Sequence, residues 1–139
     1  MLNRLTQQSP DALLALIKLH DADPAPDKID LGVGVFRTPS GATPVFGAIK
    51  AAEQRLVEGQ NSKAYLGPEG DMGFVRRLIP HIFGEGAKSD RLDGMQTPGG
   101  TGAVRLALAL AKRSGVKRVL MGVPSWPNHA QIVADLGME

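Results

Sequence analysis

The chain has 139 residues, of which 42% are hydrophobic and 22% are charged, an ordinary balance for a globular protein. Sixteen basic residues against fourteen acidic ones leave a net charge of +2, which is too small for the electrostatic footprint of a nucleic-acid-binding protein. The lack of cysteine excludes disulfides, thiolate metal sites and a cysteine nucleophile. No apolar stretch has the length of a membrane span or the pattern of a signal peptide, so we expect a cytoplasmic protein without a membrane partner.

The N-terminal part predicts an arm followed by a helix. Residues 1–8 are polar and are expected to be extended. Ser9 is a good N-cap and Pro10 suits the first helical position, so a helix is expected from there to about His20.

Residues 29–36 (IDLGVGVF) are expected to be extended. Gly32 and Gly34 weaken this segment as a central strand. The glycines either serve the backbone geometry or allow a ligand to approach the chain closely, and both interpretations remain open.

Two helices are expected in the middle of the chain. Apolar residues recur with helical spacing before Gly59, at Val45, Ile49, Ala52 and Leu56. A second helix is predicted over residues 72–83, where Pro80 should kink or shorten it.

The C-terminal part predicts a βαβ unit. A glycine-rich turn at residues 97–102 (TPGGTG) precedes an apolar helix at 103–111, a short strand at 119–123 and a second turn at 124–129 (PSWPNH). Because the carboxyl ends of parallel strands meet at one rim of a sheet, both turns are expected at the rim where open α/β folds bind ligands.

The last predicted helix covers residues 129–136, and Gly137 is a natural residue to end it. The helix over residues 103–111 is apolar nearly all round, so it needs covering on several sides. We therefore expect the 139 residues to be part of a longer protein in which the sheet continues.

The glycine-rich turn would direct the backbone N–H groups of a helix N-terminus at an anion. It lacks the Gly-Lys-Ser/Thr ending of a P-loop, and Arg105 stands where a dinucleotide fingerprint has its third glycine. Phosphate binding and a purely conformational role of the glycines both remain open. No His, Asp and Glu cluster has metal-ligand spacing, so no metal site is expected.

Trp126, the only tryptophan, lies between two prolines in the second turn. It either anchors the loop on the sheet or stacks on a planar ligand, and its place at the carboxyl end of a strand favours stacking. His129 taken alone is typical of a partly buried imidazole. Tyr65, the only tyrosine, has no functional indication by itself.

Four blocks of sequence occur in an order that resembles the class I aminotransferases that use pyridoxal phosphate, in the aspartate and aromatic amino-acid branch. The blocks are residues 29–37 (IDLGVGVFR), 64–70 (AYLGPEG), 99–105 (GGTGAVR) and 124–129 (PSWPNH). The resemblance covers nearly the whole chain and implies a fold-type-I α/β fold. It implies an arm at residues 1–8, a small-domain segment at 9–43 and the start of a large cofactor-binding domain at 44–139.

The same resemblance implies the cofactor contacts. Gly99, Gly100 and Thr101 would hold the phosphate of pyridoxal 5'-phosphate, and Trp126 would stack on its ring and border the substrate. Tyr65 would reach the cofactor phosphate of the neighbouring subunit, so the active site would be shared within a homodimer.

The resemblance implies two further roles, and the chain differs from other family members at two positions. Gly34 would lie against the α-carboxylate of the substrate. His129 would hydrogen-bond to the carboxylate that keeps the pyridine nitrogen protonated. Some relatives have serine where Gly99 stands, and Phe36 replaces a tyrosine common in the family. Lys63 lies in a polar loop and lacks the desolvated surroundings of a Schiff-base lysine.

The implied activity is the transfer of an amino group between an amino acid, aspartate or aromatic, and a 2-oxo acid. The Schiff-base lysine, the carboxylate at the pyridine nitrogen and the arginine that grips the substrate are absent from the 139 residues, so no catalytic residue is expected in this chain. One alternative is a catalytically silent 139-residue species that at most binds phosphate compounds or dimerises. Another is an unrelated Rossmann-like nucleotide-binding protein.

Overall fold

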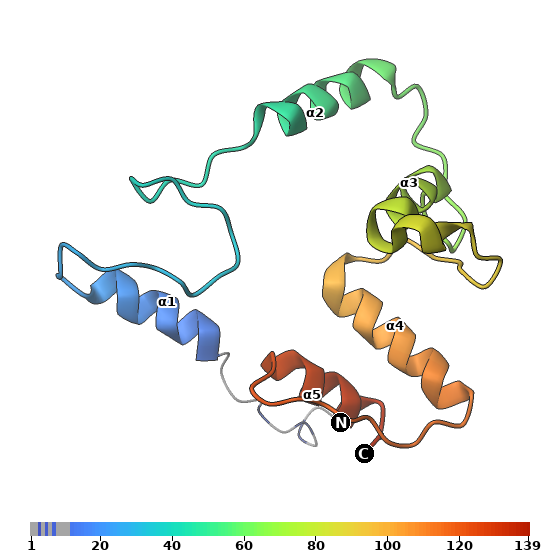
Figure 1. Cartoon of the computed structure of the whole chain (residues 1–139). Coiled ribbons are helices and arrows are strands. Elements are labelled where there is room, and N and C mark those ends of the chain that lie inside the picture. The colour runs from blue at the N-terminus through green and yellow to red at the C-terminus, as the bar shows by residue number, and fades with distance from the viewer. Residues whose placement is uncertain (1–2, 4, 6, 8–11) are drawn as a thin grey trace. The chain divides into compact units, whose positions relative to one another are not determined.

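The computed structural model describes residues 3, 5, 7 and 12–139, and this described part contains helices and irregular segments but no strand. The predicted helix start at Ser9 and Pro10, and most of the predicted arm, lie outside the described residues. Figure 1 shows the elements in chain order: α1 (Ala12–Ala22), α2 (Gly47–Gly59), α3 (Met72–Phe83), the 3₁₀ helix η2 (Gly84–Lys88), α4 (Gly99–Arg113) and α5 (Pro127–Asp135).

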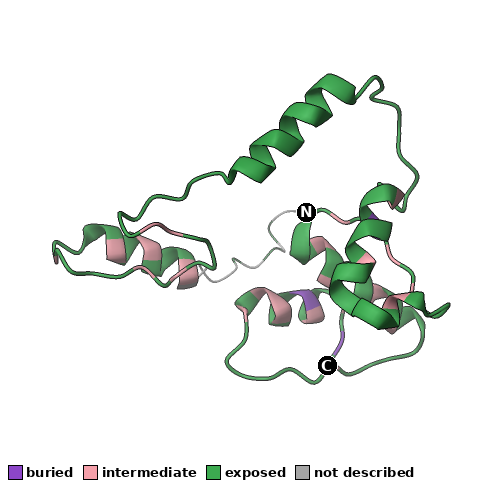
Figure 2. Ribbon diagram, turned by 45° about the horizontal axis from the view of Figure 1, so that its top comes forward, coloured by how far each residue is buried: buried purple, intermediate pink, exposed green. Residues whose placement is uncertain are grey.

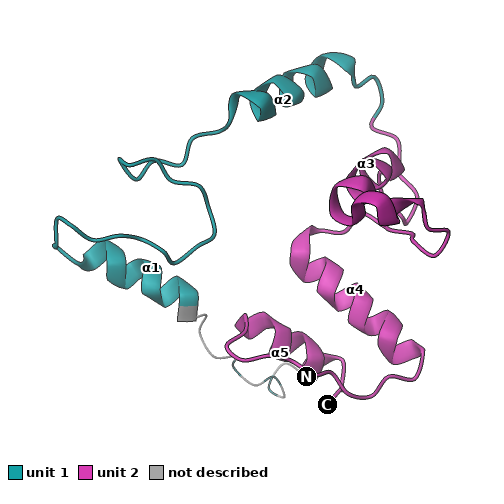
Figure 3. Ribbon diagram, viewed as in Figure 1, with its two compact units in different colours: residues 1–62 teal, residues 63–139 magenta. Residues whose placement is uncertain are grey.

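The chain divides into two compact units (Figure 3), an N-terminal unit, Met1–Ser62, and a C-terminal unit, Lys63–Glu139. The N-terminal unit holds α1 and α2, and the C-terminal unit holds α3, η2, α4 and α5. Both predicted turns, with their glycines and the tryptophan, therefore belong to one unit.

The predicted helices are confirmed with small changes at their ends. α3 has the predicted bounds, and α4 begins at Gly99, so that the glycine-rich turn is its first turn. The expected shortening of α3 at Pro80 was wrong, because the helix continues to Phe83, and the expected kink stays a prediction. Pro80 lies in the last turn, where its missing N–H removes one helical hydrogen bond, and the chain then tightens into η2.

Both C-terminal helices end in Schellman motifs. In α5 the Met138 N–H donates to the Val133 carbonyl (3.1 Å) and the Gly137 N–H to the Ala134 carbonyl (2.8 Å). Gly137 has a φ of 61°, a conformation that costs glycine little, so the predicted helix end is confirmed. α4 ends in the same way around Gly115.

The two segments expected to be extended, residues 29–36 and 119–123, are not strands in the described part of the chain. A strand forms only where a neighbour receives its hydrogen bonds. Glu139 is such a neighbour at one position: the Val119 N–H donates to its carbonyl (2.6 Å), and its own N–H donates to the Lys117 carbonyl (2.9 Å). This alternation is the pattern of parallel strands.

The described residues bury little apolar surface. Val75, Ile132 and Met138 are the buried hydrophobic residues among them (Figure 2). The chain exposes 12345 Å², whereas a compact monomer of its mass would expose about 6,900 Å² and two compact units of half that mass about 8,400 Å² together. α4 contains no buried residue and Leu110 is 71% exposed, which agrees with the expectation that this helix needs further cover.

Asp71 begins α3 and provides a stability prediction. Its Oδ1 accepts hydrogen bonds from the Gly73 N–H (2.8 Å) and the Phe74 N–H (3.1 Å). In the complete protein we expect Asp71→Ala to lower the free energy of unfolding by about 1 kcal/mol, the usual value of an N-cap. Denaturant titration measures it. Asp93→Ala is the control, because Asp93 accepts only a local bond from Gly94 among the described contacts; equal losses in the two variants would contradict the cap.

Candidate functional site

The glycine-rich turn forms the N-terminal turn of α4. Gly99 has a φ of 66°, its N–H donates to the Thr97 carbonyl (2.8 Å), and the Thr97 hydroxyl donates to the Gly99 carbonyl (3.0 Å). No side chain caps α4. The amides of Gly100 and Thr101 have no intrahelical acceptor by helix geometry, so they form a pair of donors at the positive end of the helix.

The surface at this turn is open. A Cβ added at Gly99 or Gly100 would meet no other atom within 4 Å, whereas one at Gly102 would meet Pro98 Cδ at 3.1 Å. Thr101 is exposed, and the first turn of α4 contains no acidic residue that would repel an anion. The residues present therefore fit a phosphate group that approaches the backbone of the first turn.

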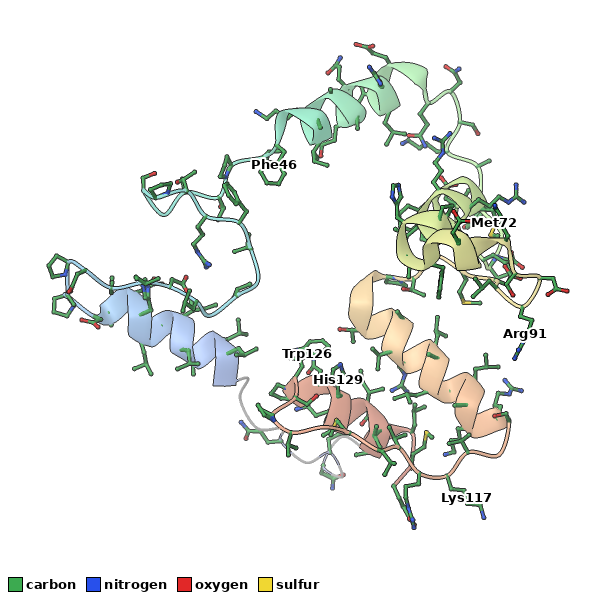
Figure 4. All side chains as sticks on the ribbon, viewed as in Figure 1. Phe46, Met72, Arg91, Lys117, Trp126 and His129 are labelled. Atoms are coloured by element: carbon green, nitrogen blue, oxygen red, sulfur yellow. The ribbon has the colours of Figure 1, made fainter. Side chains whose placement is uncertain are left out.

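The loop before α5 carries an aromatic pair. Trp126 is half-buried and directly precedes Pro127, the first residue of α5. The ring of His129 meets the indole edge-on, with centroids 5.4 Å apart and planes at 90° (Figure 4). His129 Nδ1 lies 2.8 Å from the Ser125 hydroxyl. Because Nδ1 is engaged, a carboxylate partner of this imidazole would meet Nε2.

α4 and α5 pack against each other within the C-terminal unit. An ion pair joins Arg105 and Asp135 at 3.4 Å, and Lys112 Nζ donates to the Leu136 carbonyl. Figure 1 shows the two helices side by side, with their N-terminal ends on the same side of the pair. The glycine-rich turn and the loop with Trp126 thus lie at corresponding ends of two packed helices.

The other predicted site residues lie in irregular segments. Tyr65 is fully exposed in the loop that precedes α3, in the C-terminal unit. Gly34 lies in the N-terminal unit, where an added Cβ would meet nothing within 4 Å, and its place relative to the glycine-rich turn stays a prediction. Phe36 packs on Phe46, with ring centroids 5.4 Å apart.

Sequence reasoning missed Ser125 as a partner of the predicted site. Its hydroxyl lies four residues before His129, a spacing that brings side chains together at the start of a helix. That spacing was the available signal. Sequence reasoning also missed the ion pair of Asp30 with Arg37, which no helical or strand period predicts.

Two hollows of the described structure lie in the N-terminal unit. One of about 450 Å³ is lined by Leu16, Leu19 and His20 of α1 together with residues 29–32. Within the described part, no three His, Asp or Glu residues are placed to hold a metal ion. None of the described helices combines the length and the apolar character needed to cross a membrane.

Comparison with known proteins identifies the family. Residues 26–139 match the family described as Aminotransferase class I and II. The chain belongs to this aminotransferase family. The predicted resemblance is therefore confirmed over most of the chain.

Individual members of the family are similar over the whole chain. It is 50% identical over 139 residues to a tyrosine aminotransferase of Rhizobium meliloti strain 1021, covering 100% of this chain and 36% of the relative. It is 43% identical over 143 residues to an aspartate aminotransferase of Escherichia coli strain K12, with coverage of 100% and 36%. A solved aromatic amino acid aminotransferase with 3-indolebutyric acid superimposes with a TM-score of 0.84 at 41% identity, covering 99% of this chain and 35% of that one.

The fold of the chain is thus that of solved aminotransferases. The chain spans about a third of the length of the curated relatives it matches. The remaining two thirds of those relatives have no counterpart among the 139 residues.

Proposed function

We propose that the chain is the N-terminal part of a pyridoxal-phosphate aminotransferase that moves an amino group between an amino acid, aspartate or aromatic, and a 2-oxo acid. The observation that carries this proposal is the open, uncapped N-terminus of α4, at the same end of the helix pair as Trp126. The relatives named tyrosine and aspartate aminotransferase support the substrate class.

The glycine-rich turn is the proposed phosphate site. The amides of Gly100 and Thr101 and the Thr101 hydroxyl donate to the phosphate, while Gly99 turns the chain so that the backbone faces the anion. When bound, pyridoxal phosphate supplies the electron sink for the chemistry at the amino acid's α-carbon. The protein supplies binding and orientation.

The aromatic pair is the proposed ring site. Trp126 stacks on the pyridine ring and borders the substrate, which also excludes water from that face. His129, held by Ser125, directs Nε2 at the carboxylate that keeps the pyridine nitrogen protonated. The contact of the two rings limits the rotation of the indole.

The remaining roles need a second subunit or a longer chain. Tyr65 reaches the cofactor phosphate of the neighbouring subunit in a homodimer, and its full exposure leaves the phenol accessible for that contact. Gly34 lies against the α-carboxylate of the substrate. The lysine that binds the cofactor covalently, the carboxylate at the pyridine nitrogen and the substrate-gripping arginine belong to the rest of the complete protein.

A transamination assay on the complete protein tests the proposed function. Aspartate and an aromatic amino acid serve as amino donors with a 2-oxo acid as acceptor, and pyridoxal phosphate binding is followed by absorbance. We expect turnover with at least one donor and tighter binding of pyridoxal phosphate than of a nucleotide. Tighter nucleotide binding without turnover would overturn the proposed activity.

Thr101→Val tests the phosphate site. Loss of a hydroxyl that donates to a charged group should weaken pyridoxal phosphate binding about tenfold in the complete protein. Thr43→Val is the matched control, because Thr43 is an exposed threonine outside both turns. Equal cofactor affinity in both variants, measured by titration, would remove the Thr101 hydroxyl from the site.

A further inference from the structure

The carboxylate of Asp30 and the guanidinium of Arg37 form an ion pair that joins the two ends of the segment of residues 30–37. Asp30 Oδ2 lies 2.5 Å from Arg37 Nη2, and the two side chains are only 20% and 24% exposed. Asp30 Oδ1 accepts the Gly32 N–H (2.8 Å). Arg37 Nη1 also donates to the carbonyls of Val33 (3.3 Å) and Asp30 (3.5 Å).

This pair differs from the other lysine and arginine ion pairs among the described residues. Those pairs have separations of 3.4 Å and at least half of each side chain exposed; the pair of Lys88 with Glu85, for example, is 85% and 96% exposed. Exposed ion pairs constrain the positions of their side chains only weakly. Short charge-assisted hydrogen bonds between half-buried groups keep both side chains in one relative position. The Asp30–Arg37 pair belongs to the second kind.

The Asp30 carboxyl is held in its ionised form. The Gly32 N–H and the charges of Arg37 and His20 lower the pKa of Asp30 below its ordinary value of 3.8, although burial acts in the opposite direction. The ionised carboxylate accepts from the backbone and from the guanidinium together. The charge of Arg37 is thus compensated within its own segment.

The bonds of Asp30 and Arg37 hold the backbone around Gly32 and Gly34. Between the ends of the segment, the Val35 N–H donates to the Val33 carbonyl (2.8 Å), which turns the chain at Gly34. A Cβ at Gly32 would lie 3.2 Å from Asp30 Oδ1, whereas Gly34 faces open space. Glycine has the most backbone freedom to lose on ordering, so a segment of this composition needs such constraints to keep one shape.

We propose that Asp30 and Arg37 form a positioning pair that holds the backbone at Gly34 in the shape that receives the substrate carboxylate, an inference that rests on the proposed function. Arg37 is not itself the carboxylate ligand, because its guanidinium is engaged with oxygen atoms of Asp30 and Val33. Because the segment is already ordered before substrate binds, substrate binding does not lose conformational entropy in ordering it.

Kinetics of the complete protein test the positioning pair. Arg37→Gln and Asp30→Asn should each raise KM for the amino donor about tenfold, with kcat and pyridoxal phosphate affinity unchanged. The double variant should be no worse than the poorer single variant, because both remove one interaction. Arg37→Lys should recover part of the loss. Lys88→Gln, from the exposed ion pair, is the matched control and should leave KM unchanged.

Hydrogen exchange supplies a readout that does not depend on activity. Without substrate, amides of residues 32–35 should exchange about tenfold faster in Arg37→Gln than in the unaltered protein, while α1 keeps its rates. Faster exchange with unchanged KM, or unchanged exchange, would overturn the positioning role; faster exchange throughout α1 would instead show general unfolding and also overturn it. If the unaltered protein lacks turnover, the proposed function fails, and the exchange result still decides whether the pair holds the segment.

Discussion

Trp126→Ala in the complete protein should weaken pyridoxal phosphate binding about tenfold or more, since stacking of an aromatic side chain on a heterocycle contributes about 1–3 kcal/mol and 1.4 kcal/mol is a factor of ten. Transamination should slow as well, because the ring is less well oriented. The indole is half-buried and its edge contact with His129 holds it in place. Cofactor titration and the steady-state rate measure the two effects.

Two further variants separate stacking from loop anchoring. Trp126→Phe keeps a flat ring and should recover most of the cofactor affinity, although its smaller ring fills less of the loop. Lys117→Ala changes an exposed side chain on the segment that precedes the loop and should leave affinity and rate unchanged. If Trp126→Ala lowers thermal stability while affinity and rate stay unchanged, the tryptophan anchors the loop and the stacking role is wrong.

The 139-residue chain produced by itself should show no transamination and no cooperative thermal unfolding. Its described part buries three hydrophobic residues, and its exposed surface of 12345 Å² exceeds the roughly 8,400 Å² of two separate compact units of half its mass. α2 has no buried residue, and a helix of its length is marginal in water without packing. For the isolated chain, this prediction is the same as the alternative of a catalytically silent 139-residue species.

The measurements compare the isolated chain with the complete protein. An intact mass of 14.7 kDa first establishes that the isolated chain is the species under study. Circular dichroism should then show a gradual loss of helix on heating, whereas the complete protein should unfold in a single cooperative transition and turn over substrate. Turnover by the 14.7 kDa species would refute the prediction and would require a catalytic lysine within these residues.

Local sequence predicted the helices because their determinants lie within a few residues. The bounds of α3 and the end of α5 at Gly137 follow from apolar spacing and from turn chemistry. Pro80 does not shorten α3, because a proline in the last turn removes only one hydrogen bond. The segment at 29–36, expected to be extended, and the segment at 119–123, predicted as a strand, are not strands in the described part of the chain, because strand pairing depends on neighbours that spacing does not reveal.

By itself the sequence determined the family and the helices, because the order of the four blocks and the helical periods are read along the chain. It also placed the glycines and Trp126 in turns at the starts of helices. Only the tertiary structure decided which side chains meet: Ser125 with His129, and Asp30 with Arg37. Such contacts depend on dihedral angles and on distances of a few ångströms, which residue type and spacing leave undetermined.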